Sequence, residues 1–359
     1  MEGSPVDIIV FAPLAPILGV LLFWFIQLLF IESQKYLLEK IRPKHEPFCR
    51  FTNFLGIFFQ SICHALGFTV TKSGISDFYI SVSYGKVAPK KQKKGVFEWI
   101  ANFFLFVGPF FVPAFLLLIC LFFLVENSFA FEAPAHILEW KYTFSGQLTT
   151  FGANLYAFSN KFFAFLINID LFNPGHFGFL LLMIFLGLGI RPSHVGEQKV
   201  DRVNMIYDLK NIWGLIRYKP LYVFLAFLVG YVLFYASFLF SQDWYVILFS
   251  VFGWVSIISI VSLVITHLLL LLIKTTDKVE GRKKFLPYII LPLSYTLMRL
   301  LFVYIKTDYD LSLSLIFTIV ITAFVAYYIR KEKKEKTNKF KFKLGIKLFR
   351  KKDEEEDNE

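Results

Sequence analysis

Long apolar runs separated by short charged loops constrain the fold of this chain more than any other feature. The clear runs are 8–31, 98–125, 219–241, 244–273, 286–305 and 311–329. Each is about as long as a helix that crosses the roughly 30 Å hydrocarbon core of a bilayer. Shorter or more polar runs lie at 51–70 and 175–190. We therefore expect an all-α polytopic membrane protein with about seven or eight membrane segments.

The composition agrees with this class. The 359 residues are 56% hydrophobic, above the roughly 45–50% of soluble domains. The net charge is +11, and no motif of a nucleic-acid-binding module occurs, so we assign the charge to a membrane surface and expect no nucleic-acid partner. The acidic N-terminus lacks the basic segment of a cleavable signal, so we expect the first apolar run to be retained as an anchor.

The runs and loops divide the chain into four parts. We expect an N-terminal anchor span with a charged connector at 1–50, a membrane core at 51–218, a four-span bundle at 219–329 and a tail at 330–359 that is basic and then acidic. The core contains Phe78–Val87, whose composition is typical of strands. We therefore expect a small membrane-associated β-element after the second membrane segment.

Two further segments of the core have distinctive patterns. Gly108, Pro109 and Pro113 interrupt the middle of the run 98–125, which predicts a kink in that span because proline removes a helical hydrogen bond. Leu148–Phe172 is amphipathic and aromatic. This pattern predicts a helix that either lies at the membrane interface or packs under the bundle.

Lysine and arginine are distributed unevenly among the loops. Basic loops alternate with loops that are poor in these residues, and the positive-inside rule then places the basic loops and the C-terminus in the cytoplasm. The lysine content and the missing signal suggest a prokaryotic plasma membrane. The basic residues that we expect to lie on anionic lipid headgroups are Lys90, Lys91, Lys93, Lys94, Lys341, Lys343 and Lys347.

The segment 51–70 is compatible with two topologies. If it crosses the membrane fully, the basic connector 32–50 lies on the side opposite to the basic loop 71–97, against the positive-inside rule. If it is re-entrant, both loops lie in the cytoplasm. Re-entrant elements occur only where protein or a cavity shields the backbone. Both alternatives remain open on the sequence alone.

Polar side chains inside membrane segments are the candidate functional residues, because they are costly in lipid and usually face protein or a water-filled cavity. Gln60, Ser61 and His64 fall in the second segment, and Arg299 lies deep in a later span. We group these four residues as a predicted polar membrane cluster. Long basic side chains can extend toward a nearby carboxylate, and for Arg299 the candidates are Asp308 and Asp310.

The motif Gln60-Ser61-Ile62-Cys63-His64, followed by a strand-like run, resembles the site-2 protease family of intramembrane zinc metalloproteases. In that family a membrane helix carries HExxH, whose two histidines bind zinc while the glutamate activates water. Here Gln60 stands at the position of the first ligand, Ser61 at that of the general base and His64 at that of the second histidine. The resemblance covers residues 50–215 and implies a protease-like membrane core.

These substitutions imply a relative without catalytic residues. Neither Gln60 nor Ser61 titrates near neutral pH, so neither can serve as a general base. One histidine also does not supply the three protein ligands of a catalytic zinc site. We therefore expect no cofactor. If zinc does bind, the candidate ligands are His64, His176 and His194.

Three functions fit these patterns. The first is a pseudo-protease that binds a membrane partner, which requires an apolar groove or an exposed strand edge beside Phe78–Val87. The second is a transporter or lipid-handling protein with a polar cavity around His64 and Arg299, which requires a continuous polar path and helices broken at mid-depth. The third is an atypical active membrane metalloprotease, which requires two further ligands within zinc distance of His64.

Overall fold

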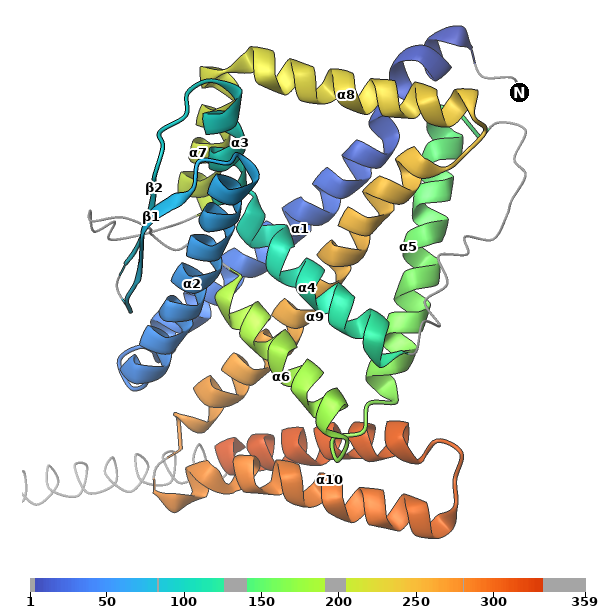
Figure 1. The fold of residues 1–359 in the computed structure, drawn as a ribbon. Coiled ribbons are helices and arrows are strands. Elements are labelled where there is room, and N and C mark those ends of the chain that lie inside the picture. The colour runs from blue at the N-terminus through green and yellow to red at the C-terminus, as the bar shows by residue number, and fades with distance from the viewer. Residues whose placement is uncertain (1–3, 83, 126–140, 191–204, 280, 332–359) are drawn as a thin grey trace, which may run out of the picture. The chain divides into compact units, whose positions relative to one another are not determined.

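The computed structural model describes residues 4–82, 84–125, 141–190, 205–279 and 281–331 (Figure 1). The chain divides into two compact units, Met1–Leu268 and Leu269–Glu359. The first unit contains η1 (Asp7–Phe11), α1 (Leu14–Ile41), α2 (Glu46–Val70), β1 (Ile75–Ile80), β2 (Gly85–Pro89), α3 (Val96–Phe106), α4 (Gly108–Leu124), α5 (Phe144–Ile167), α6 (Pro174–Gly189), α7 (Met205–Tyr218), α8 (Pro220–Leu239) and most of α9 (Trp244–Thr276). The second unit contains the end of α9, then η2 (Arg282–Phe285), α10 (Leu286–Ile305) and a last helix, Asp310–Lys331.

Most of these helices have the length and composition of membrane spans. Within the described ranges, six helical segments are long and apolar enough to cross a bilayer: α1, α2, α8, α9, η2 together with α10, and Asp310–Lys331. The bent pair α3 and α4 raises this number to as many as seven, and α6 is a shorter apolar helix. The predicted all-α polytopic architecture is confirmed, and the chain is an integral membrane protein.

The kink predicted in the run 98–125 is confirmed. Helix α3 ends at Phe106, α4 begins at Gly108, and their axes differ by 69°. Pro109 lies in the first turn of α4 and Pro113 lies within it. Because proline has no N–H to donate, these residues are compatible with the start of a new helix and weaken its continuation from α3.

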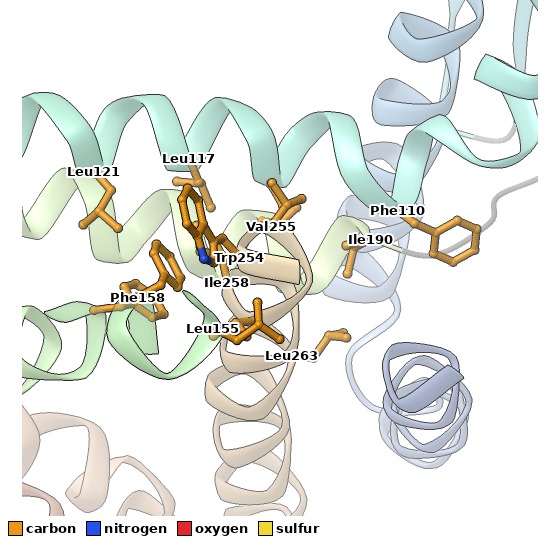
Figure 2. Packing of buried hydrophobic residues seen from close by; sticks show 14 of the residues in the cluster. Phe110, Leu117, Leu121, Leu155, Phe158, Ile190, Trp254, Val255, Ile258 and Leu263 are labelled. Carbon is orange, nitrogen blue, oxygen red and sulfur yellow. The ribbon is translucent and has the colours of Figure 1, made fainter. Parts of the chain in front are cut away.

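The first unit has a large hydrophobic core to which α1, α4, α5, α6, α8 and α9 contribute buried residues. Figure 2 shows part of it, where residues of α4 and α5 meet those of α9. The rings of Phe158 and Trp254 stack with centroids 5.4 Å apart, and the indole N–H of Trp254 donates to the Asn154 carbonyl oxygen at 3.2 Å. Of the two placements expected for Leu148–Phe172, packing against the bundle is therefore confirmed. Helices α8 and α9 share this core with the preceding helices.

The β-element is confirmed, but Phe78–Val87 is not one continuous strand. It covers the second half of β1 and the first half of β2, which pair antiparallel with Phe78 opposite Val87 and Ile80 opposite Gly85. The chain reverses between them, where the Ser81 N–H donates to the Tyr84 carbonyl oxygen at 2.9 Å. Serine and glycine near the reversal favour a turn.

The second unit contains a helical hairpin. Helix α10 ends at Ile305, the left-handed backbone of the next residue, Lys306 (φ 57°), turns the chain, and the last helix begins at Asp310. The Arg299 guanidinium forms an ion pair with the Asp310 carboxylate, which confirms one of the two partners expected for Arg299. On the same two helices, the ring centroids of Phe302 and Phe317 lie 5.6 Å apart.

Candidate functional site

The polar residues of the second membrane segment lie on one unbroken helix, α2, which spans 25 residues. Gln60 and His64 are four residues apart and Ser61 and His64 three, so successive turns bring them to neighbouring positions on the helix surface. Gln60 is 8% exposed and Ser61 is fully buried. The length of α2 suffices for a full crossing, which is the first of the two topologies expected for this segment.

Each of these three side chains carries a buried atom without a hydrogen-bond partner among the described residues. The atoms are Gln60 Oε1, Ser61 Oγ and His64 Nδ1. Buried polar atoms in folded proteins are nearly always paired with protein or with water, and an unpaired one costs about 1–3 kcal/mol. These three atoms are therefore available to form hydrogen bonds with a polar ligand or with ordered water.

The break between α3 and α4 lies against this part of α2. A Cβ added to Gly108, the first residue of α4, would lie 3.0 Å from Cβ of Cys63. Cys63 is fully buried and directly precedes His64. One turn later, Phe68 of α2 forms a small hydrophobic cluster with Val87 of β2 and Ala101 of α3. The polar residues of α2 are thus close in sequence to contacts with both the broken span and the β-hairpin.

The β-hairpin runs back along α2, as Figure 1 shows. Its tip is fixed where the Asn53 Nδ2 group donates to the Val82 carbonyl oxygen at 2.8 Å. Its base is fixed by Lys93, whose ammonium donates to the Thr71 carbonyl oxygen at 2.6 Å and lies 4.6 Å from the centre of the Phe97 ring. The hairpin therefore extends beside the stretch of helix that carries the three polar residues.

The basic residues expected on headgroups differ in their surroundings. Lys93 is half-buried by the contacts at the base of the hairpin, whereas Lys90, Lys91 and Lys94 are exposed. The exposed three are compatible with the predicted contact with lipid. The tail residues Lys341, Lys343 and Lys347 lie outside the described residues.

The other candidate zinc ligands have different environments. His176, near the start of α6, accepts a hydrogen bond at Nδ1 from the Asp170 N–H at 3.1 Å, which ties the preceding loop to the helix. His194 lies outside the described residues. Within the described parts of the chain, no three or more His, Cys, Asp or Glu side chains gather as a metal site. A catalytic zinc ion needs three protein ligands from His, Cys, Asp or Glu side chains. Among Gln60, Ser61 and His64 only the histidine is of that kind, so these three residues do not form a catalytic zinc site.

Arg299, the fourth member of the predicted polar cluster, belongs to the second unit. Gln60, Ser61 and His64 belong to the first. The partner of Arg299 is Asp310, in its own unit. The shared cavity expected around His64 and Arg299 therefore stays a prediction.

No family model, curated protein or solved structure matches this chain. The resemblance to site-2 proteases thus rests on the residues of α2 and on the strand-like run that follows them.

A second polar region, absent from the sequence-based candidates, lies on α1. Gln27 is fully buried and Gln34 is 3% exposed, and their amide nitrogens donate to the carbonyl oxygens of Phe110 and Gly187 at 3.1 and 2.8 Å. The two glutamines are seven residues apart, so two turns of helix bring them to the same face. In the sequence, the available signal is Gln27, a polar residue inside the otherwise apolar run 8–31, whereas Gln34 lies in the charged connector that follows.

Proposed function

We propose that this integral membrane protein is a non-catalytic relative of site-2 proteases that binds an extended segment of a membrane partner along β1. The observation that carries the proposal is the exposure of that strand. In the described part of the chain β1 pairs with β2 alone, and every residue of β1 except Ile80 is exposed.

An edge strand of this kind offers backbone N–H and C=O groups to an incoming chain, and its side chains offer apolar contacts for selectivity. Phe78 and Tyr79 are 50% and 51% exposed. The hairpin is held on the membrane helix α2 through Asn53 and Val82. A segment that adds to β1 would therefore be bound beside the membrane-spanning part of the protein.

The residues on α2 support the non-catalytic part of the proposal. Gln60 and Ser61 occupy the positions of the first zinc ligand and the general base in the family that the motif resembles, and neither side chain can perform that task. Both side chains are buried, as expected for a polar membrane interior that performs no catalysis.

Site-specific photo-crosslinking in native membranes tests the proposal. A photoreactive phenylalanine analogue in place of Tyr79 should crosslink to one segment of a membrane protein. The same analogue in place of Tyr156, which is 70% exposed on α5 of the same unit, is the matched control and should not capture that segment. Equal capture from both positions, or none from Tyr79, would contradict partner binding along β1.

A second candidate function, transport or lipid handling, is favoured by a different observation. The broken span α3–α4 approaches α2 at Cys63, the residue before His64, and broken helices that line a polar site are typical of transporters. If this function holds, Gln60→Leu should remove a lipid or solute that co-purifies with the wild-type protein, as measured by native mass spectrometry. Crosslinking from Tyr79 would then be unaffected.

A further inference from the structure

Helices α1, α4 and α9 enclose a second group of buried polar atoms, built around the Phe110 carbonyl oxygen. This oxygen accepts hydrogen bonds from Gln27 Nε2 of α1 at 3.1 Å and from Ser259 Oγ of α9 at 3.5 Å. The ring of Trp24, one turn before Gln27 on α1, packs edge-on against the Phe110 ring with centroids 5.8 Å apart. Three helices therefore converge on one residue at the start of α4.

Three atoms on α1 and α9 are buried and have no partner within the described residues: Trp24 Nε1 and Gln27 Oε1 of α1, and Ser262 Oγ of α9. Gln27 and Ser262 are fully buried, and Ser262 lies one turn beyond Ser259 on α9. The indole can only donate, the amide oxygen can only accept and the hydroxyl can do both. Their roles are complementary, and none of the three is charged.

The same seam between α1 and α9 continues toward the surface. On α1, the Gln34 amide donates to the Gly187 carbonyl oxygen at 2.8 Å, and a Cβ added to Gly187 would overlap the Ser262 carbonyl oxygen. Next to Gln34, the exposed Ser33 hydroxyl lies 2.9 Å from Nε2 of His267 on α9. Along α9, Ser262 thus lies between Ser259, at the Phe110 junction, and the half-buried His267.

We propose that Trp24, Gln27 and Ser262 bind ordered water inside the membrane-spanning part of the first unit. Water both donates and accepts, and a buried water typically makes about three hydrogen bonds to groups that would otherwise be unsatisfied. Each such group would cost about 1–3 kcal/mol if left unpaired, and the hydrocarbon core supplies no other partner. The uncharged lining suits water rather than an ion.

Water contact at the indole nitrogens tests this site in the full-length protein in detergent. With ¹⁵N-labelled tryptophan, the Trp24 indole N–H should show a cross-peak to long-lived water in a water-selective NOE experiment. Trp254 is the internal control, because it is 8% exposed and its indole N–H already donates to the Asn154 carbonyl oxygen. It should show no such peak. The Trp24 resonance is assigned by its loss in Trp24→Phe.

The double variant Gln27→Leu/Ser262→Ala should abolish the Trp24 water peak. Ser256→Ala is the matched control: Ser256 is equally buried on α9, but its hydroxyl donates to the Phe252 carbonyl oxygen, so the peak should persist. A dry Trp24 in the wild type, or a peak unchanged in the double variant, would overturn the proposal. If the double variant does not fold, the water cross-peaks of Trp24 and Trp254 in the wild-type protein still test whether water is bound at Trp24.

Discussion

At the scale of single residues, several buried polar atoms have no hydrogen-bond partner among the residues that the structure describes. Some could be predicted: Gln60, Ser61 and His64 stand out because the run around them is short and polar. Others could not, because a serine in a helix usually satisfies itself on a carbonyl one turn earlier. Ser256 does so on Phe252, whereas Ser262 does not. Only tertiary packing distinguishes the two serines.

Zinc content tests the assignment of α2 as a non-catalytic segment. Elemental analysis of purified wild-type protein should find no stoichiometric zinc, because Gln60 and Ser61 replace groups that a catalytic site requires. The value should be the same in His64→Ala. Stoichiometric zinc in the wild type that disappears in His64→Ala would instead support an active metalloprotease.

Close approach of backbones at Gly187 predicts a large effect from a single methyl group. In Gly187→Ala, the new Cβ would overlap the Ser262 carbonyl oxygen and lie 2.7 Å from Cγ2 of Thr266. The free energy of unfolding should fall by about 1–3 kcal/mol, as for other overpacked sites. Thermal unfolding in detergent measures this change.

The control for that experiment is on the same helix. Gly178 of α6 has nothing within 4 Å of an added Cβ, so Gly178→Ala should leave the midpoint unchanged or raise it slightly, because alanine favours the helix by about 0.5–1 kcal/mol over glycine. Equal losses at both positions would show that α6 does not pack closely on α9 at Gly187.

At the scale of elements, the apolar runs predict the helices well because their length must match the bilayer. The break at Val107 could also be predicted, since Pro109 and Pro113 remove donors from a helix. The composition of Phe78–Val87 does not predict the chain reversal within it, because the residues on both sides of the turn are typical of strands. The burial of α5 was left open by the sequence, since amphipathic helices suit an interface and a bundle equally.

The ion pair of the second unit predicts a difference between two neighbouring carboxylates. Asp310→Asn should lower the free energy of unfolding by about 1–2 kcal/mol, since a charge-assisted hydrogen bond to Arg299 is lost and the pair is only partly exposed to solvent. Asp308→Asn, at an exposed position, should have no measurable effect. If the two variants shift the thermal midpoint equally, the pair contributes no specific stability.

At the scale of the whole molecule, the unbroken helix α2 leads us to expect a full crossing. Single cysteines placed at Lys44 and Lys91, in a background without the three native cysteines, should then react with a membrane-impermeant maleimide from opposite sides of sealed vesicles. The reason is that the two positions flank a helix of 25 residues, long enough to span the hydrocarbon core. Labelling of both positions from one side would instead establish the re-entrant topology.

The length of α9 has a consequence for the choice of lipid. Its 33 residues correspond to about 50 Å at 1.5 Å per residue, whereas a typical hydrocarbon core is about 30 Å thick. Such hydrophobic mismatch is relieved by tilting of the helix, by local thickening of the bilayer or by projection of one end into water. Each of these costs free energy for every ångström of mismatch, and this cost sorts proteins between membranes of different thickness. Helix α9 should therefore make the stability of this protein depend on acyl-chain length, with thicker bilayers favoured.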